Sequence, residues 1–411
     1  MTLQEEPDKI QQKYSTPGGR AWRRFKRNKS ALFGLIVIVL SVVIAILGYQ
    51  ITPDSTRNAN DQILQITNKP PGFEITLLHR HKNRDVTRRT WVGKMLFGQE
   101  NPYELIPIID YEIRENKIYF NEFRGRKLPG LSDSMDIADL HFAVSPDHRE
   151  SAIQNGNLIY TDYQGVQQTV DLAALQKSTG DDLIRSRKFR LGTDRFGRDM
   201  LSRIIIGVRI SLSVGLIAVL ISLLIGVILG ATAGYFRGRF DDFVMWFINV
   251  VWAIPTILLV IAITLALGRG FWQIFLAVGL TMWVEVARII RGQVMGLREM
   301  QFVEAARSLG FSHARTIFIH ILPNVVGPVV VISAANFASA IIIEAGLSFL
   351  GIGVQPPTPS WGSMLNENYG YILGTNPFLA IIPGIAIMLL VLAFNLVGNG
   401  FRDAMDVKTK T

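Results

Sequence analysis

Glu285 and Glu344 are acidic residues that interrupt long apolar stretches of this sequence. A carboxylate in such surroundings could carry protons along a pathway, because an uncompensated charge there costs about 2.5–3.5 kcal/mol and is rarely kept without use. Local pairing of Glu285 with Arg288, one helical turn later, is the favoured interpretation of the first residue. For Glu344, tying helices together explains the residue at least as well as a pathway role.

A second group of candidates is a charge cluster ahead of the apolar stretch that begins at residue 210, made of Asp194, Arg198, Asp199 and Arg203. We expect ion-paired packing there. His79 and His81 are closely spaced among six histidines and would share one face of a strand. Two ligands do not make a metal site, so surface histidines and no metal site are predicted.

Motifs for bond-making chemistry are absent from the sequence. It holds no G-x-x-x-x-G-K-[ST], no H-E-x-x-H and no G-x-S-x-G, and it has no cysteine. These absences predict no catalytic residue, no cofactor on this chain and no enzymatic activity. Any energy that its work requires must come from another subunit.

Long apolar segments are the elements that position these residues. The chain has 411 residues, 49% of them hydrophobic and only 18% charged, against about 25% charged in soluble domains. Each segment is long enough for a membrane-spanning helix, which needs roughly 20 residues. Six are expected, at residues 30–53, 210–236, 243–268, 271–290, 316–343 and 368–401. The first, with its apolar core at 31–51, is read as a retained anchor because that core is too long for a signal peptide.

The polar segment 52–209 separates the first two helices. Ile, Tyr and Phe alternate in it around Glu115-Asn116 and Gln164-Gly165, which predicts two β-hairpins. The predicted fold is therefore an all-α polytopic membrane protein of six helices with a β-rich extracytoplasmic insertion at about 68–183. The remaining divisions are an N-terminal segment 1–30, a five-helix core 210–398 and a tail 399–411.

Charge distribution predicts the orientation. With the N-terminus cytoplasmic, the inner segments 1–30, 237–242, 288–320 and 399–411 hold 18 basic residues, and the two short outer loops hold one. This excess indicates that both termini are cytoplasmic. The net charge of +9 is accounted for by these inner segments, which argues for membrane topology and against nucleic-acid binding.

The loop 288–324 between the fourth and fifth predicted helices is the most informative stretch. Gln301–Leu309 should form a helix with Phe302, Ala305, Ala306 and Leu309 on one face. Gly310 follows where a helix ends in a left-handed residue, and Ser312 can cap a second helix. The residues alone leave two alternatives about even: a rigid knob for a partner protein, or an amphipathic helix on the bilayer.

Several motifs resemble one family. Glu304-Ala305-Ala306, Gly310 and Ile321-Leu322-Pro323 are similar to the EAA loop of ABC importer permeases. Further stretches resemble the dipeptide, oligopeptide and nickel subgroup, and specifically its permease C type with a Gly-Thr-Asp signature. They are residues 22–29, the outer signature (Gly192, Thr193, Asp194, Gly197, Arg198 and Asp199), residues 348–362 and the ending from 395 to 403.

The resemblance implies a permease subunit of an ATP-driven, binding-protein-dependent importer of peptides or similar small solutes in the bacterial inner membrane. It implies that Glu304, Ala305, Ala306, Gly310, Leu322 and Pro323 couple the chain to an ATPase. The implied partners are a homologous second permease, ATPase subunits that hold ATP and Mg, an extracytoplasmic solute-binding protein and membrane lipid. Phe189, Arg190, Asn399 and the long insertion depart from the family pattern, and the substrate is left open.

Other residues and other functions are left open. Asn336 and Ser339, with Glu344, are candidates to line a passage, although hydrogen bonding between helices explains the first two equally well. The outer signature could contact the binding protein instead of only packing. A proton-coupled secondary transporter using Glu285 or Glu344, and a membrane-anchored receptor using the outer domain, are the alternative functions.

Overall fold

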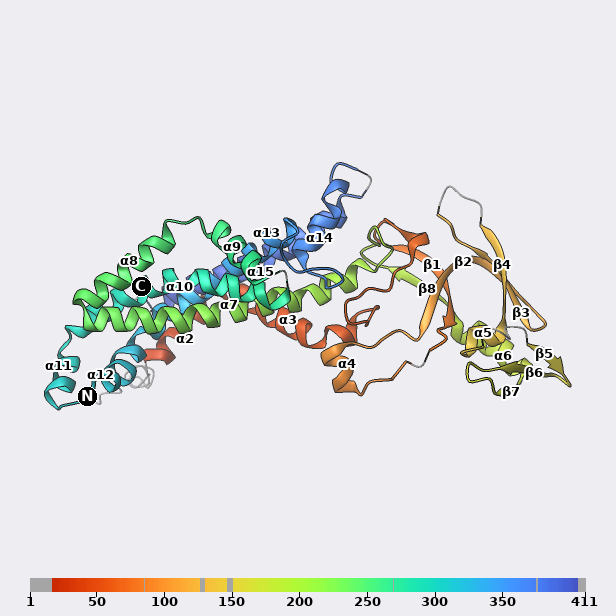
Figure 1. Cartoon of the computed structure of the whole chain (residues 1–411), viewed down its shortest axis with the longest axis horizontal. Coiled ribbons are helices and arrows are strands. Elements are labelled where there is room, and N and C mark those ends of the chain that lie inside the picture. The colour runs from red at the N-terminus through yellow and green to blue at the C-terminus, as the bar shows by residue number, and fades with distance from the viewer. Residues whose placement is uncertain are drawn as a thin grey trace, which may run out of the picture.

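The chain is elongated, with a bundle of long helices at one end and β-sheets at the other (Figure 1). The computed structural model describes residues 17–84, 86–125, 130–145, 151–268, 270–374 and 376–405. Residues 1–16 of the predicted segment 1–30 lie outside these ranges, as do residues 406–411 of the predicted tail 399–411. Arg269 also lies outside them. We call the end that holds α11 (Gln301–Ser308) and α12 (His313–Arg315) the bundle end, and the end that holds the β-sheets the insertion end.

Five helical segments of the described residues are long and apolar enough to cross a membrane, or six if one bent pair counts as a span. The five are α3 (Lys29–Ile51), α7 (Met200–Phe236), α10 (Phe271–Arg298), the segment His313–Phe349 that ends in α13 (Leu322–Phe349), and α15 (Phe378–Met405). The polytopic membrane class is therefore confirmed, whereas the count of six continuous helices is not.

The stretch 243–268, predicted as one helix, is broken in the structure. It lies within α8 (Gly238–Trp252) and α9 (Thr256–Leu267), which meet at an angle of 90°. The break holds Pro255, which has no N–H to donate and disfavours a helical conformation for the residue before it. Hydropathy alone missed the bend because the break is as apolar as the helices beside it.

Two other predicted boundaries were also wrong. Helix α7 begins at Met200, ten residues before the expected start at 210, because Arg203 is buried in ion pairs and Arg209 lies over the Tyr49 ring at 4.6 Å. The uncharged stretch from 368 is not one helix either. Short elements, α14 (Trp361–Asn368) and η4 (Tyr369–Tyr371), precede α15.

The β-rich insertion is present and contains two sheets. A five-stranded antiparallel sheet has the order β4-β3-β2-β1-β8, and a three-stranded sheet has the order β5-β6-β7. Both predicted hairpins are confirmed, as β2 pairs with β3 and β6 with β7. The strands are β1 (Phe73–His81), β2 (Tyr103–Arg114), β3 (Lys117–Glu122), β4 (Leu131–Asp136), β5 (Ala152–Gln154), β6 (Asn157–Thr161), β7 (Gln167–Asp171) and β8 (Ile184–Phe189).

A short helix, η1 (Leu64–Ile66), precedes β1. Four others lie between strands: α4 (Trp91–Phe97), α5 (Ile137–His141), α6 (Leu172–Ser178) and η2 (Thr179–Leu183). Strand β8 closes the large sheet by pairing with β1, so the sheet extends six residues past the expected limit at 183. Phe189, which departs from the family pattern, is buried and its ring lies 6.4 Å from that of Phe73. Phe189 is therefore part of the packed core of the insertion.

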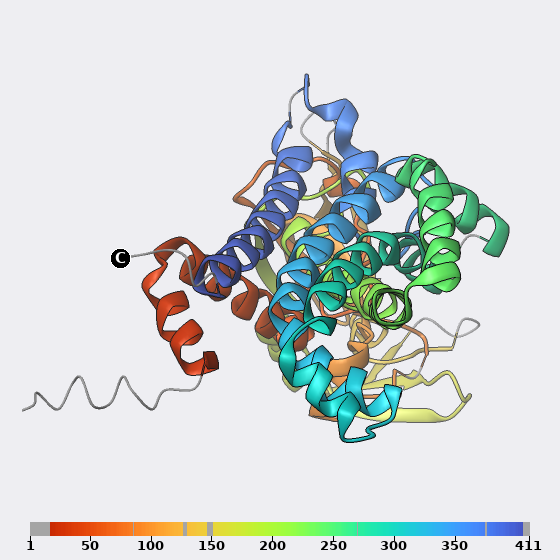
Figure 2. The same ribbon diagram turned by 90° about the vertical axis from the view of Figure 1, so that its left-hand side faces the viewer.

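The bundle packs around α7 and α10, which approach closely along glycines of α7. A Cβ at Gly226 would lie 2.5 Å from the Val286 side chain, so only glycine allows this spacing. Helix α2 (Pro17–Arg27) joins the bundle through Phe25, whose ring centroid lies 4.5 Å from that of Phe401 in α15. These elements lie at the bundle end together with α11 (Gln301–Ser308) and α12 (His313–Arg315) (Figures 1 and 2).

Candidate functional site

The candidate site is the α11 loop, residues 299–321, which protrudes at the bundle end. Helix α11 ends in two hydrogen bonds: Gly310 N–H donates to Arg307 O at 2.9 Å and Phe311 N–H donates to Ala306 O at 3.1 Å. Gly310 has φ +76°. This pattern is a Schellman motif, which closes a helix end with a left-handed residue. The predicted cap is also present, since Ser312 Oγ accepts from Arg315 N–H at 3.4 Å.

Of the four residues expected on one face of α11, only Ala306 is buried, and the inward face is completed by Val303. Val303 is buried against Ile317, Ile321 and Val325, and Ala306 is buried as well. Phe302, Ala305 and Leu309 are exposed instead, and Leu309 is 73% exposed. The apolar spacing was read correctly, but the short helix leaves most of that face uncovered. The loop therefore presents an apolar surface of low relief, and a Cβ at Gly310 would meet no atom within 4 Å.

Aromatic and hydrogen-bonded contacts fasten the α11 loop to the end of α7. The Tyr235 hydroxyl lies 3.0 Å from His313 Nδ1. The Arg307 guanidinium lies 4.9 Å from the centre of the Tyr235 ring. Within the loop, Phe311 stacks on His320 at 5.5 Å. The α11 loop is therefore in direct contact with α7.

A second connection leads into α13. Residues Thr316–Ile321 (η3) form a π-helical turn, and Leu322 and Pro323 begin α13. Proline cannot donate to the preceding turn and its ring crowds the carbonyl four residues earlier, which favours a widened turn at this point. Four of the six predicted coupling residues lie together in or beside α11: Glu304, which is exposed, Ala305, Ala306 and Gly310. The other two, Leu322 and Pro323, lie at the start of α13.

The 192–199 loop holds the outer signature and lies far from the α11 loop, between the insertion and the start of α7. Arg198 Nε lies 2.6 Å from Asp194 Oδ2, and Arg198 Nη2 lies 2.6 Å from Glu367 Oε2. Arg203 also approaches Asp194 at 3.6 Å and Glu367 at 3.3 Å. The expected ion pairs are present for Asp194, Arg198 and Arg203, whereas Asp199 caps α7 instead. The four ion-paired side chains, Glu367 included, are at most 7% exposed.

Backbone geometry explains the glycines of this loop. Gly192 and Gly197 have φ +76° and +70°, and a Cβ on either would overlap a backbone carbonyl, of Lys69 or of Ile63. Thr193 is buried and accepts from Lys69 N–H at 3.0 Å. Asp199 caps α7 by accepting from Ser202 N–H at 2.9 Å, and burial raises the pKa of its carboxyl. The loop therefore joins the insertion to the bundle.

The candidate pathway residues fall into two groups. Asn336 and Glu344 of α13 are buried, and Glu344 Oε1 accepts from the Ser348 hydroxyl at 2.7 Å. Ser339 is exposed.

The predicted pairing of Glu285 with Arg288 is wrong, because Arg288 donates to Asn249 at 3.2 Å and lies 3.4 Å from the centre of the Trp252 ring. These partners on α8 compete successfully for the arginine, and Glu285 stays exposed.

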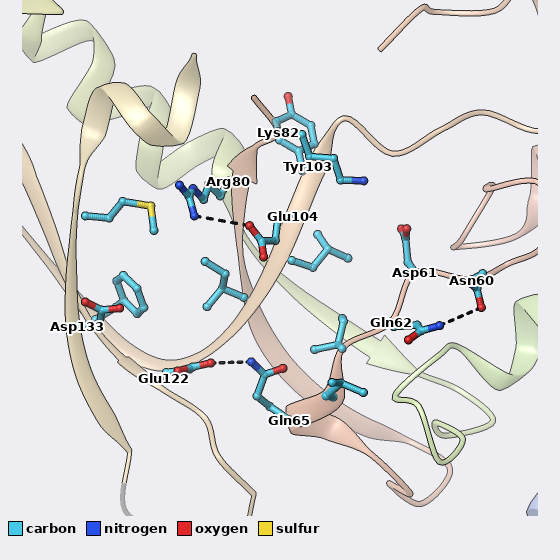
Figure 3. Close-up of a pocket in the computed structure, with 16 residues that line it drawn as sticks. Asn60, Asp61, Gln62, Gln65, Arg80, Lys82, Tyr103, Glu104, Glu122 and Asp133 are labelled. Atoms are coloured by element: carbon cyan, nitrogen blue, oxygen red, sulfur yellow. Dashed lines mark hydrogen bonds and ion pairs between the residues drawn. The ribbon is translucent and has the colours of Figure 1, made fainter. Parts of the chain in front are cut away.

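The insertion holds cavities that the sequence did not indicate. One of about 590 Å³ lies between residues 60–65 and the large sheet (Figure 3). Its charged groups are partly paired within the lining, Arg80 with Glu104 at 3.7 Å and Gln65 with Glu122 at 2.6 Å. His79 and His81 do share one face, both against the Tyr103 ring, and no cluster of three metal-binding side chains occurs in the described ranges.

Two residues of these networks were missed by sequence reasoning. Glu367 is the only charged residue between Glu344 and Arg402, and that isolation was a usable signal for a buried partner. Tyr235 gave no such signal, because one tyrosine near a helix end is common at a membrane interface.

Comparison with known proteins gives consistent matches. Residues 222–411 match the family described as binding-protein-dependent transport system inner membrane component, and residues 16–71 match the N-terminal TM domain of oligopeptide transport permease C. The glutathione transport system permease protein GsiD of Pectobacterium atrosepticum is 44% identical over 221 residues, covering 54% of this chain and 73% of the relative. GsiD of Shigella sonnei is 44% identical over 219 residues, covering 53% and 72%.

Among solved structures, the inward-facing MetNI methionine ABC transporter matches with a TM-score of 0.42 and 18% identity, covering 50% of this chain and 98% of that one.

The fold, the α11 loop and the sequence matches define the class of protein: a permease subunit of a binding-protein-dependent importer, embedded in the inner membrane by several spans. The chain belongs to the binding-protein-dependent transport system inner membrane component family. In such systems a separate subunit hydrolyses ATP, and this chain is the transport subunit, without enzymatic activity.

Proposed function

We propose that this chain forms half of a translocation pathway for peptides or similar small solutes and takes its energy from an ATPase that docks on the α11 loop. The relatives are named as glutathione transporters, and glutathione is itself a small peptide. A homologous second permease, a pair of ATPase subunits that hold ATP and Mg, and an extracytoplasmic solute-binding protein complete the importer.

The observation that carries the proposal is the construction of the α11 loop. Its helix is closed by the Schellman motif and anchored by Val303 and Ala306, while Ala305 and Leu309 stay exposed. A rigid element with an apolar exposed face suits docking into a groove of another protein. An amphipathic helix on the bilayer would need no connections into α7 and α13, and this loop has both.

The proposed mechanism is alternating access. Nucleotide binding by the ATPase displaces the α11 loop, and the displacement passes through Tyr235 to α7 and through Pro323 to α13. In the proposed orientation the bundle end is cytoplasmic and the insertion extracytoplasmic. The positions of α2, α11 and the end of α15 at one end of the molecule support this topology.

The test replaces Gly310 with proline. Proline cannot adopt φ +76° and removes the hydrogen bond to Arg307. We expect Gly310→Pro to abolish ATP-dependent uptake of peptide into proteoliposomes that contain the whole importer, while the solute-binding protein keeps its affinity. Unchanged uptake would reject the coupling role, and uptake that follows an ion gradient and ignores ATP depletion would favour a secondary transporter.

Gly165 provides a matched control. It has φ +82°, donates to Asp162 O at 2.9 Å and has nothing within 4 Å of a Cβ, but it lies in a hairpin turn of the insertion. Gly165→Pro imposes the same local strain as Gly310→Pro. If the α11 loop has the proposed role, only the Gly310 variant loses uptake.

A further inference from the structure

Glu285 lies in the middle of α10, and its side chain is not covered by any residue that the structure describes. Every other residue between Thr281 and Ala287 is buried, and Glu285 alone is exposed. It lies about 21 Å along the helix from Phe271, which places it within the roughly 30 Å of hydrocarbon that a span crosses. A carboxylate facing lipid there costs about 2.5–3.5 kcal/mol, so this face turns toward protein or water.

The charge of Glu285 is not neutralised by the described part of the chain. No ion pair there includes it. The two arginines that follow it on α10 are engaged with α8: Arg288 with Asn249 and Trp252, and Arg291 with Asp241 at 2.5 Å. Both arginines, one and two helical turns from Glu285, therefore bind other groups. The carboxylate is left able to bind a cation transiently.

The same face of α10 is open beyond Glu285. Gly292 and Gly296 are exposed, and a Cβ on either would meet no atom within 4 Å. At 3.6 residues per turn, both lie within roughly 20° of Glu285 around the helix axis. A strip without side chains therefore runs from the carboxylate toward the bundle end, and a solute can approach the backbone closely along it.

We propose that Glu285 faces the translocation pathway and binds a cationic group of the transported solute, namely the ammonium group at the amino terminus of a peptide. This inference rests on the proposed function and adds the chemical feature of the cargo that the permease recognises. The negative charge of Glu285 suits a cationic ligand, and its place within a span beside the strip of Gly292 and Gly296 suits a transported solute. A peptide, the cargo proposed above, carries such a cation at its amino terminus. The carboxylate accepts hydrogen bonds from the ammonium group, and no proton is transferred.

The experiment uses the complete importer in proteoliposomes, with ATP inside and trialanine as the cargo. Loss of a charge-assisted hydrogen bond predicts that Glu285→Gln lowers trialanine uptake about tenfold or more. ATP hydrolysis stimulated by the loaded binding protein should persist, which a merely structural role would not allow. Glu285→Asp keeps the charge and should retain most of the uptake. Glu115→Gln, an exposed acid in a hairpin turn of the insertion, is the matched control and should change neither rate.

Three outcomes would contradict the inference. Glu285→Gln that imports trialanine at the wild-type rate overturns it. Glu285→Gln that loses the second permease on purification, while Glu285→Asp keeps it, also overturns it, by showing that the cation belongs to the neighbouring subunit. If the wild-type importer takes up no trialanine with ATP, the proposed peptide function fails and the inference falls with it, a result distinct from the other two.

Discussion

Arg198 and Glu367 are 169 residues apart in the sequence, yet their side chains form a buried ion pair with Nη2 and Oε2 2.6 Å apart. The pair joins the 192–199 loop to α14, and Arg203 and Asp194 extend it on either side. Ion-paired side chains that are buried from water therefore connect the insertion to the bundle.

Removal of Glu367 should destabilise this junction strongly. Glu367→Ala leaves two buried guanidinium groups, of Arg198 and Arg203, with Asp194 as their shared partner. Breaking a buried pair by removing one partner costs about 3–5 kcal/mol. Thermal unfolding of the purified complex in detergent measures the effect. The control is Glu112→Ala, which removes an exposed ion pair with Arg114 and should change stability by less than about 1 kcal/mol. Equal effects of the two variants would refute the role of the junction.

Alanine at position 197 should be poorly tolerated. The left-handed conformation costs a non-glycine residue about 1–2 kcal/mol, and overlap of the new Cβ with Ile63 O adds about 1–3 kcal/mol of overpacking. Gly197→Ala should therefore lower the yield of folded protein sharply. Gly165→Ala shares the left-handed conformation but meets no neighbour, so it isolates the first contribution. A Gly197 variant as stable as the Gly165 variant would show that the 192–199 loop can move away from residue 63.

Acidic pH should stabilise the protein through Asp61, which accepts a hydrogen bond from Asn101 of the insertion. Burial, and then the nearby Asp54 carboxylate, raise the pKa of Asp61 from 3.8 to about 6. The folded protein thus disfavours the charged form, so stability is greatest when Asp61 is protonated and is lost as pH rises from about 4 through 6. Asp61→Asn should stabilise the protein at pH 7 by up to about 3 kcal/mol and flatten this pH dependence. Unfolding curves at pH 5 and pH 7 test it, and an unchanged pH dependence in Asp61→Asn would assign it to another group.

Tyr235→Phe should weaken coupling without unfolding the chain. The change removes only the hydroxyl that contacts His313 at 3.0 Å, a hydrogen bond that contributes about 1 kcal/mol. Fewer solute molecules should then cross per ATP hydrolysed, as measured by uptake and phosphate release in the same proteoliposomes. Tyr119→Phe, at an exposed tyrosine of the insertion, is the control. An unaltered ratio in Tyr235→Phe would mean that force reaches the bundle through α13 alone.

Local patterns in the sequence predicted local structure well. The glycine at 310 and the serine at 312 specify the end of one helix and the start of the next through contacts within a few residues, and the structure has both. The hairpins at Glu115 and Gln164 follow from alternation and turn residues for the same reason. The β-rich insertion and the membrane class were also predictable, because each depends on composition summed over a segment.

Contacts between distant elements were not predictable in the same way. Arg288 was assigned to Glu285 because the two are one turn apart, but Trp252 and Asn249 of another helix bind it instead. The bend at Pro255 and the exposed face of α11 depend on neighbours that hydropathy does not report. Glu367 lies 169 and 164 residues from its partners Arg198 and Arg203, so no local pattern connects them.

The length of α7 gives the molecule a mechanical property. Its 37 residues form a rod of about 55 Å, well beyond the roughly 30 Å of a bilayer core. One tip carries Tyr235 at the α11 loop and the other is clamped by the 192–199 loop. A tilt of about 10° would displace one tip by about 10 Å relative to the other. If α7 tilts as one rod, a probe placed on the insertion will report a movement that begins at the α11 loop.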